Sequence, residues 1–180
     1  MSYVIISIRK INFYIEKGKI KKMRILVFSD THKRIDDCIR VIERINDVDM
    51  IIHAGDHASD AKELQKMFLD IPVWYVRGNC DFTYDDEEII VEAEDKKIMV
   101  THGHLYNVKN DMGYATLKEK AKKLGADIVV FGHTHIPYNE NLGDLFVLNP
   151  GSVKSGRTFG VIEVENGKIG TAVCDCGGIM

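Results

Sequence analysis

Short apolar runs alternate with segments of helical periodicity through the first half of this 180-residue chain, and no other feature limits the fold so strongly. The first run ends in a polar residue, as a buried strand does, and apolar residues then recur at helical spacing. The pattern continues as strand, helix and strand, which predicts an α/β fold class. The expected strands are Arg24–Ser29, Met50–His53 and Val73–Arg77, and the expected helices are Ile35–Ile45 and Ala61–Leu69.

The second half is mostly β-strand. Two runs separated by an acidic, polar turn indicate a hairpin, and later runs are joined by Gly-Asp and Asn-Gly turns, which are typical of hairpins. No linker, repeat or low-complexity tract divides the chain, so we expect one domain in which two sheets pack face to face with helices outside. The expected strands are Glu88–Glu92, Lys97–Thr101, Asp127–Phe131, Leu145–Leu148, Phe159–Val164 and Lys168–Val173, and the expected helix is Tyr114–Leu124.

Composition favours a globular protein that stays in the cytoplasm. Hydrophobic residues make up 45% of the chain and charged residues 28%, close to the averages for soluble domains. No apolar stretch approaches the roughly 20 residues that cross a bilayer. The run Val4–Ile8 is too short for the apolar part of a signal peptide. Four cysteines do not indicate a disulfide framework. Because no apolar stretch is long enough to cross a bilayer, we expect no membrane partner.

Charge separates the first residues from the rest. Residues 1–24 carry seven Lys and Arg against one acid, which leaves 17 basic and 26 acidic residues beyond them, a net charge of −9. We expect a basic extension over residues 1–22 and the domain over residues 23–180. Met23 stands directly before the first strand, so the extension is either an upstream translation artefact or an added strand. The body lacks the basic stripe of a dedicated nucleic-acid binder.

Ligand-type side chains follow five of the predicted strands at the point where each strand ends. Because the carboxyl ends of strands in an α/β sheet share one edge, these side chains should converge. Carboxylates and imidazoles crowded at a partly buried edge are costly unless something pairs with them, and divalent cations would do so. Oxygen and nitrogen ligands without thiolate suit Mn, Fe, Co, Ni or Zn. The five clusters are Asp30-Thr31-His32, Gly55-Asp56, Gly78-Asn79-Cys80-Asp81, Thr101-His102-Gly103-His104 and Gly132-His133-Thr134-His135.

The order D-x-H, G-D, G-N-[HC]-D, H-G-H and G-H-T-H resembles the calcineurin-like metallophosphoesterase superfamily, from about Arg24 to Asp175. The G-N-C-D variant, the small size and the segment Asn149–Ser152 are similar to the compact YfcE-type prokaryotic phosphodiesterases. The resemblance implies a four-layer αββα sandwich in which helices flank two mixed β-sheets. It also implies a phosphodiesterase that acts on a small-molecule phosphate ester.

The resemblance further implies a dinuclear site with an attacking hydroxide between two divalent ions. The main alternative is a non-enzymatic interaction scaffold, because a eukaryotic retromer subunit resembles this fold and keeps much of the site. The intact ligand set favours the enzyme. A zinc hydrolase of the metallo-β-lactamase type is excluded because no H-x-H-x-D-H run is present. The implied ligands are Asp30, His32 and His135 for one ion, Asn79, His102 and His133 for the other, and Asp56 for both.

Several residues beside these ligands have open roles. His57 and His104 could contact a phosphate oxygen or protonate the leaving group, and they could equally orient ligands. Asn149–Ser152 could present backbone N–H groups to the site or form a simple Pro-Gly turn. The remaining three expectations are a buried structural role for His53, a contact of Asp81 with Asn79 or a histidine, and a backbone shape at the strand end for Gly78.

Cys80 departs from the wider superfamily, in which many phosphatases have a histidine acid at this position. A thiol is a poor proton donor to an alkoxide. We therefore expect diesters with good leaving groups rather than monoesters. The segments His104–Tyr114 and Tyr138–Asp144 are candidate specificity loops. The sequence leaves the substrate, the native metal and homo-oligomer formation open.

Overall fold

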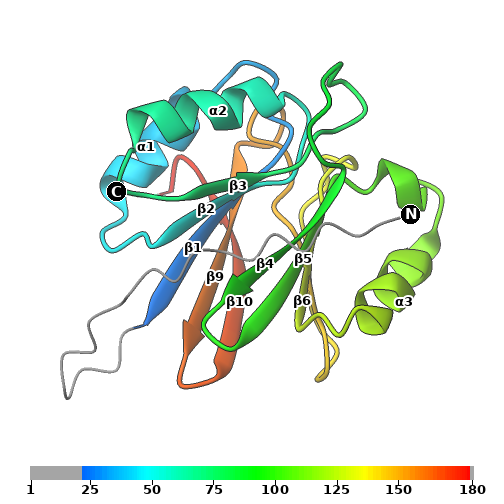
Figure 1. Cartoon of the computed structure of the whole chain (residues 1–180). Helices are drawn as coiled ribbons and strands as arrows, with labels where there is room; N and C mark the ends of the chain where they lie inside the picture. The colour runs from blue at the N-terminus through cyan, green and yellow to red at the C-terminus, as the bar shows by residue number, and fades with distance from the viewer. Residues whose placement is uncertain (1–21, 179–180) are drawn as a thin grey trace.

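The computed structural model describes residues 22–178, and within them the chain forms two five-stranded sheets (Figure 1). The first sheet has the order β10-β9-β1-β2-β3 and the second the order β4-β5-β6-β8-β7. Both are mixed, because each has parallel central strands and an antiparallel neighbour. The strands are β1 (Met23–Phe28), β2 (Met50–His53), β3 (Val73–Tyr75), β4 (Glu88–Ala93), β5 (Lys96–Thr101), β6 (Ile128–Val130), β7 (Tyr138–Asn141), β8 (Phe146–Asn149), β9 (Thr158–Glu165) and β10 (Lys168–Asp175).

The helices lie outside the two sheets. Helices α1 (Asp36–Arg44) and α2 (Ala58–Met67) cover the first sheet, and α3 (Ala115–Lys123) covers the second on the opposite side of the molecule (Figure 1). Two short 3-10 turns, η1 (His104–Tyr106) and η2 (Met112–Tyr114), precede α3. The predicted four-layer αββα sandwich is confirmed.

Alternation along β1 shows how the sequence builds these layers. Ile25 and Val27 pack between the two sheets, whereas Leu26 and Phe28 face α1 and α2. Successive side chains of a strand point to opposite faces, so a strand covered on both faces must be apolar throughout. The same rule holds in β6, where Ile128 and Val130 fill the core between the sheets.

Two expectations about elements differ from the structure by more than two residues. The segment expected as a loop around Tyr138–Asp144 contains strand β7, an edge strand that pairs with β8. Helix α2 begins at Ala58, three residues before the expected start. This earlier start has a tertiary cause, because the carboxylate of Asp81 accepts the backbone N–H groups of His57 and Ala58 at 3.1 and 2.9 Å.

Strands β1, β2 and β3 run parallel, and so do β5, β6 and β8. The segments that follow all six strands carry the candidate functional residues.

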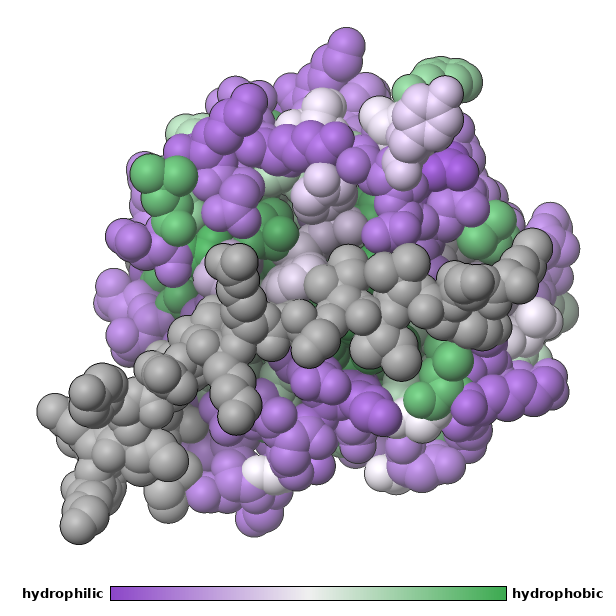
Figure 2. Space-filling view, viewed as in Figure 1, coloured by the Kyte–Doolittle hydropathy of each residue, from purple (hydrophilic) through white to green (hydrophobic). Residues whose placement is uncertain are grey.

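Polar residues cover most of the face seen in Figure 2, and apolar residues appear there in small separate groups. None of the helices within residues 22–178 is long and apolar enough to cross a bilayer. The predicted basic extension lies outside the described residues except for Lys22, whose Nζ is 2.6 Å from Oε2 of Glu163.

Candidate metal centre

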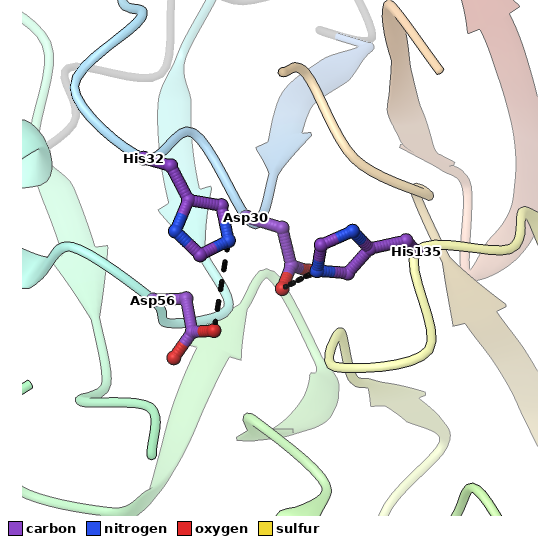
Figure 3. Close-up of side chains that lie close together, drawn as sticks. All are labelled: Asp30, His32, Asp56 and His135. Carbon is purple, nitrogen blue, oxygen red and sulfur yellow. Dashed lines mark ion pairs between the residues drawn. The ribbon is translucent and has the colours of Figure 1, made fainter. Parts of the chain in front are cut away.

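Four side chains from both sheets point toward one another at the carboxyl ends of the strands (Figure 3). Asp30 and His32 follow β1, Asp56 follows β2, and His135 follows β6. One potential ligand atom from each lies within 4.8 Å of the others. The predicted convergence is therefore correct for these four residues.

Two atoms of this group are buried and lack a hydrogen bond. Oδ2 of Asp30 accepts the Ser29 hydroxyl at 2.6 Å and the backbone N–H of His133 at 3.1 Å, but Oδ1 accepts nothing. Nε2 of His32 is also unpaired, and it lies 3.7 Å from Oδ2 of Asp56. Buried polar atoms are rarely left unpaired, so this pair of atoms fits a missing ligand. Carboxylate oxygen and imidazole nitrogen are donors for a divalent cation.

A second convergence of acceptors lies on the other side of Asp56. Nδ1 of His102 is 2.8 Å from the carbonyl oxygen of Ala54, to which it must donate, so Nε2 of a neutral ring carries a lone pair. That Nε2 lies 3.2 Å from Oδ1 of Asn79 and 3.3 Å from Oδ1 of Asp56. The His133 ring is 5.0 Å from the His102 ring, centroid to centroid. Three acceptors that face one another need a cation or a proton between them.

The charges at this site suit cation binding. Burial raises the pKa of Asp56, but the hydrogen bonds from His102 and from the backbone N–H of Cys80 outweigh it and hold the pKa well below its ordinary value. Burial lowers the pKa of His133 to about 4, and His102 adds to the effect. Burial also lowers the pKa of His32, despite the neighbouring carboxylates. Near neutral pH these groups therefore present an ionised carboxylate and neutral rings.

His102 behaves differently from the other two rings. Burial lowers its pKa, but the hydrogen bond to Asp56 and the charge of Asp30 more than compensate, so that the pKa is raised. In the protein without metal, a proton on Nε2 can thus stand between His102 and Asp56. A cation at the same position would displace that proton, as metal binding to histidine requires.

The backbone is strained where these residues occur. Five of the seven predicted ligands have a positive φ, in the left-handed region that non-glycine residues usually avoid. Such strain persists where the surroundings enforce it, and it clusters at functional sites. The φ angles are 54° at Asp30, 44° at His32, 57° at Asp56, 69° at His133 and 61° at His135.

Glycines allow the ligand segments to approach closely. A Cβ at Gly55 would lie 2.8 Å from Nδ1 of His102, and a Cβ at Gly78 would overlap Oδ1 of Asp56. Gly78 has no positive φ, so a left-handed backbone is not the reason for glycine at this position. Its role is to leave room for the Asp56 carboxylate.

The two additional histidines lie beside different parts of the centre. The His57 ring is 5.1 Å from the His32 ring, and the His104 ring is 5.5 Å from the His102 ring. Nε2 of His104 is 3.4 Å from Oε1 of Glu87, while its Nδ1 is buried without a hydrogen bond. Both rings remain candidates for contact with substrate.

The structure bears on the expectations about neighbouring residues. Asp81 accepts the backbone N–H groups of Gly78, His57 and Ala58, so the expected contact with a histidine is confirmed and is made through the His57 backbone. The Asn79 amide instead donates to Sγ of Cys80 at 3.5 Å, which leaves its Oδ1 facing His102.

The segment Asn149–Ser152 has a role that neither sequence alternative describes. The Asn149 amide donates to the carbonyl oxygen of Gly132 at 2.9 Å, and the Ser152 hydroxyl donates to the carbonyl oxygen of Asp30, also at 2.9 Å. Both side chains are fully buried. They therefore fix the backbone of two ligand segments, at Gly132 and at Asp30.

Residues 23–167 match the family model of the calcineurin-like phosphoesterase superfamily domain. The chain belongs to this superfamily. The probable metallophosphoesterase YsnB of Bacillus subtilis is 34% identical over 151 residues, which cover 80% of this chain and 86% of the relative. A phosphodiesterase of Methanocaldococcus jannaschii is 32% identical over 167 residues, which cover 79% and 94%. The phosphodiesterase YfcE of Escherichia coli is 34% identical over 104 residues, about half of each chain (49% and 50%).

Solved structures agree with this membership of the superfamily. A Streptococcus pneumoniae protein described as a predicted phosphoesterase has a TM-score of 0.70 and 27% identity, covering 88% of this chain and 92% of its own. Vacuolar protein sorting 29 of Cryptosporidium parvum has a TM-score of 0.68 at 19% identity, covering 87% and 98%, a likeness of fold alone. The predicted family is confirmed.

Proposed function

We propose that this chain is a phosphodiesterase that holds two divalent ions and hydrolyses a small-molecule phosphodiester. The observation that carries the proposal is the placement of the Asp56 carboxylate. Its Oδ2 faces His32, and its Oδ1 faces Nε2 of His102, which also lies 3.2 Å from Oδ1 of Asn79. One carboxylate that turns an oxygen toward each of two groups of donors suits a bridge between two ions.

The remaining ligands divide between the two positions. Asp30, His32 and His135 would hold one ion, and Asn79, His102 and His133 the other. When bound, two such ions supply positive charge for the phosphoryl oxygens and lower the pKa of a water molecule. The protein contributes fixed donors, because Ser29 bonds the other carboxylate oxygen of Asp30 and Ala54 bonds the other ring nitrogen of His102. The backbone N–H of Cys80 fixes Oδ1 of Asp56. Mn, Ni, Fe, Co and Zn all suit this donor set.

The residues around the centre favour diesters with good leaving groups. Burial, with the nearby Asp56 carboxylate, raises the pKa of the Cys80 thiol to about 11. That thiol stays protonated at neutral pH and is a weak acid toward a departing alkoxide. His57 and His104 are the two imidazoles left to contact a phosphate oxygen or to donate a proton.

A scaffold function on the same fold is the alternative. The complete set of seven donor side chains favours the enzyme, because a surface that only binds a partner has no need of them. A cytoplasmic location, the absence of a membrane or nucleic-acid partner, and homo-oligomer formation stay as predictions from the sequence.

The deciding experiment combines a metal count with turnover. The full chain is stripped with a chelator, then supplied with Mn, Ni, Fe, Co or Zn separately, and bound metal per chain is measured by elemental analysis. Hydrolysis of bis-p-nitrophenyl phosphate should vanish on stripping and return with at least one metal. Two ions per chain with no hydrolysis under any metal would favour the scaffold.

A further inference from the structure

A buried series of hydrogen bonds joins the segment after β1 to the segment after β2. The Thr31 hydroxyl donates to Oδ2 of Asp60 at 2.6 Å, so its oxygen is free to accept from Nε2 of His53, which is 3.0 Å away. Nδ1 of His53 in turn accepts the backbone N–H of Gly55 at 3.3 Å. The same Oδ2 of Asp60 accepts the backbone N–H of Lys33 at 2.7 Å. Every polar atom along the series between Gly55 and Lys33 thus has a partner.

These hydrogen bonds fix the backbone next to three of the proposed ligands. Thr31 stands between Asp30 and His32, and Gly55 directly precedes Asp56. Lys33 and Gly55 have positive φ, 68° and 94°, as the three proposed ligands do. A left-handed residue reverts to an ordinary conformation unless its neighbours are held, and here the holding bonds come from Thr31, His53 and Asp60.

The residues of the series are buried, and its hydrogen bonds lie mainly beside one of the two proposed metal positions. Thr31 and His53 are fully buried and Asp60 is 4% exposed, so water cannot replace a lost bond. None of its hydrogen bonds is made to the side chains of Asn79, His102 or His133. Thr31, at the centre of the series, lies between Asp30 and His32, two ligands of the first proposed position. Loss of the series should therefore disturb one metal position more than the other.

We propose that Thr31, His53 and Asp60 are positioning residues that set the affinity of the metal position formed by Asp30, His32 and His135. The proposal rests on the proposed two-metal function. The three residues are not among the proposed ligands, and they would act through the backbone of the two ligand segments. Outer partners of metal ligands typically change affinity by about 10- to 100-fold. If the network were purely structural, its loss would lower overall stability and would change the metal affinities of both positions equally.

Calorimetric titration of the metal-free full chain with Mn²⁺ tests the proposal. Thr31→Val keeps the shape of the side chain and removes the hydroxyl, whereas Thr31→Ser keeps the hydroxyl. In Thr31→Val, one of the two binding events should weaken by about 10- to 100-fold while the other changes by less than about twofold. Thr31→Ser should restore the first event. The Mn²⁺ concentration for half-maximal hydrolysis should rise by the same factor, with the rate at saturating Mn²⁺ nearly unchanged.

Ile162→Val is the matched control, because it loosens the core between the sheets without touching the series. Should Thr31→Val fail to fold, Asp60→Asn is the second variant, and it should weaken the same event. Two unchanged binding events in either variant, or equal weakening in the variant and in Ile162→Val, would overturn the proposal. A wild-type chain that binds two ions but hydrolyses no diester would refute the proposed function alone. A wild-type chain that binds no ion would refute both.

Discussion

Nε2 of His135 lies 3.0 Å from Oδ1 of Asp30, and yet the two atoms form no hydrogen bond. Asp30 follows β1 of the first sheet and His135 follows β6 of the second, and their side chains point toward each other (Figure 3). Donor pairs that meet without sharing a proton are the arrangement expected of two ligands of one ion. Nε2 of His102 and Oδ1 of Asn79 also meet, at 3.2 Å, and Oδ1 of Asp56 lies 3.3 Å from the same Nε2, so Asp56 is the residue that would be common to both proposed positions.

Replacement of Asp56 should therefore affect both metal positions. We expect Asp56→Asn to lose both ions, or to lose activity by more than the roughly 10- to 100-fold that an outer partner of a ligand contributes. Elemental analysis and diester hydrolysis measure the two effects. Asp144→Asn, at an exposed carboxylate that pairs with Lys122, is the control and should behave as the wild type. Unchanged metal content and turnover in Asp56→Asn would end the two-metal interpretation.

A methyl group at Gly78 should be as damaging as the loss of a ligand. The added Cβ would overlap Oδ1 of Asp56, and overpacking of this kind typically costs about 1–3 kcal/mol when the structure shifts to relieve it. Here the shift would move the proposed bridging carboxylate. We expect Gly78→Ala to bind metal weakly and to hydrolyse diesters slowly. Gly170→Ala is the matched control, because nothing lies within 4 Å of its added Cβ and its φ is not positive. Equal activity of the two variants would contradict this prediction.

The convergence of Asp30, His32, Asp56 and His135 could be predicted from sequence, because each is a chemically distinctive residue after an apolar run. The bonds that hold the ligands could not. Thr31 and Asp60 are 29 residues apart, and nothing in either segment shows that helix α2 brings them together. The same is true of Asn149, whose amide reaches back 17 residues to Gly132. Common residues acquire such roles only through tertiary contacts.

The secondary structure, too, could be predicted from the sequence only in part. Buried central strands such as β1 are apolar at every buried position, so the sequence marks them clearly. Strand β7 reads Tyr-Asn-Glu-Asn, without alternation of apolar and polar residues, and it exists because its backbone pairs with β8. Propensity and patterning cannot reveal an edge strand of that kind.

Stability of the metal-free protein should fall between pH 6.5 and pH 4 because of His53. Burial lowers the pKa of this ring from 6.5 to about 4 in the folded state. The unfolded chain therefore takes up a proton first as the pH falls. Stability is complete above pH 6.5, declines through this window, and loses about 3 kcal/mol in total. Urea unfolding in chelator at pH 7.5 and pH 4.5 measures the decline. His53→Gln keeps a donor toward Thr31 and should lose about that much less; parallel curves for the two proteins would contradict the assignment.

A chain that starts at Met23 should fold and hydrolyse diesters at a comparable rate. Within residues 22–178 the first strand begins at Met23, and no proposed ligand precedes Asp30. The ion pair of Lys22 with Glu163 would be lost, but both side chains are partly exposed, and such pairs contribute about 0–1 kcal/mol. Thermal unfolding and diester turnover compare the two lengths. Insolubility or inactivity of the shorter chain would mean that residues 1–22 are part of the working domain.

Rates of hydrolysis should depend steeply on the leaving group. General acid catalysis typically contributes about 10²- to 10⁴-fold, and its absence weighs most on basic leaving groups. With a pKa of about 11, the Cys80 thiol gives little protonic help. Activated aryl diesters should then react well and simple alkyl monoesters poorly. A series of aryl phosphodiesters with graded phenol pKa measures the slope.

Cys80→His tests the cause of that slope. Position 80 is exposed, and its backbone N–H already bonds Oδ1 of Asp56, so a ring there would stand beside the reacting phosphate. The Cys80→His substitution should flatten the dependence of the hydrolysis rate on phenol pKa and raise the rate of monoester hydrolysis. Cys174→Ser is the control, since this partly buried thiol lies on β10, away from all ligand segments. A flat series in the native enzyme would instead show that His57 or His104 already donates the proton. In that case the thiol at position 80 would not limit the choice of substrate.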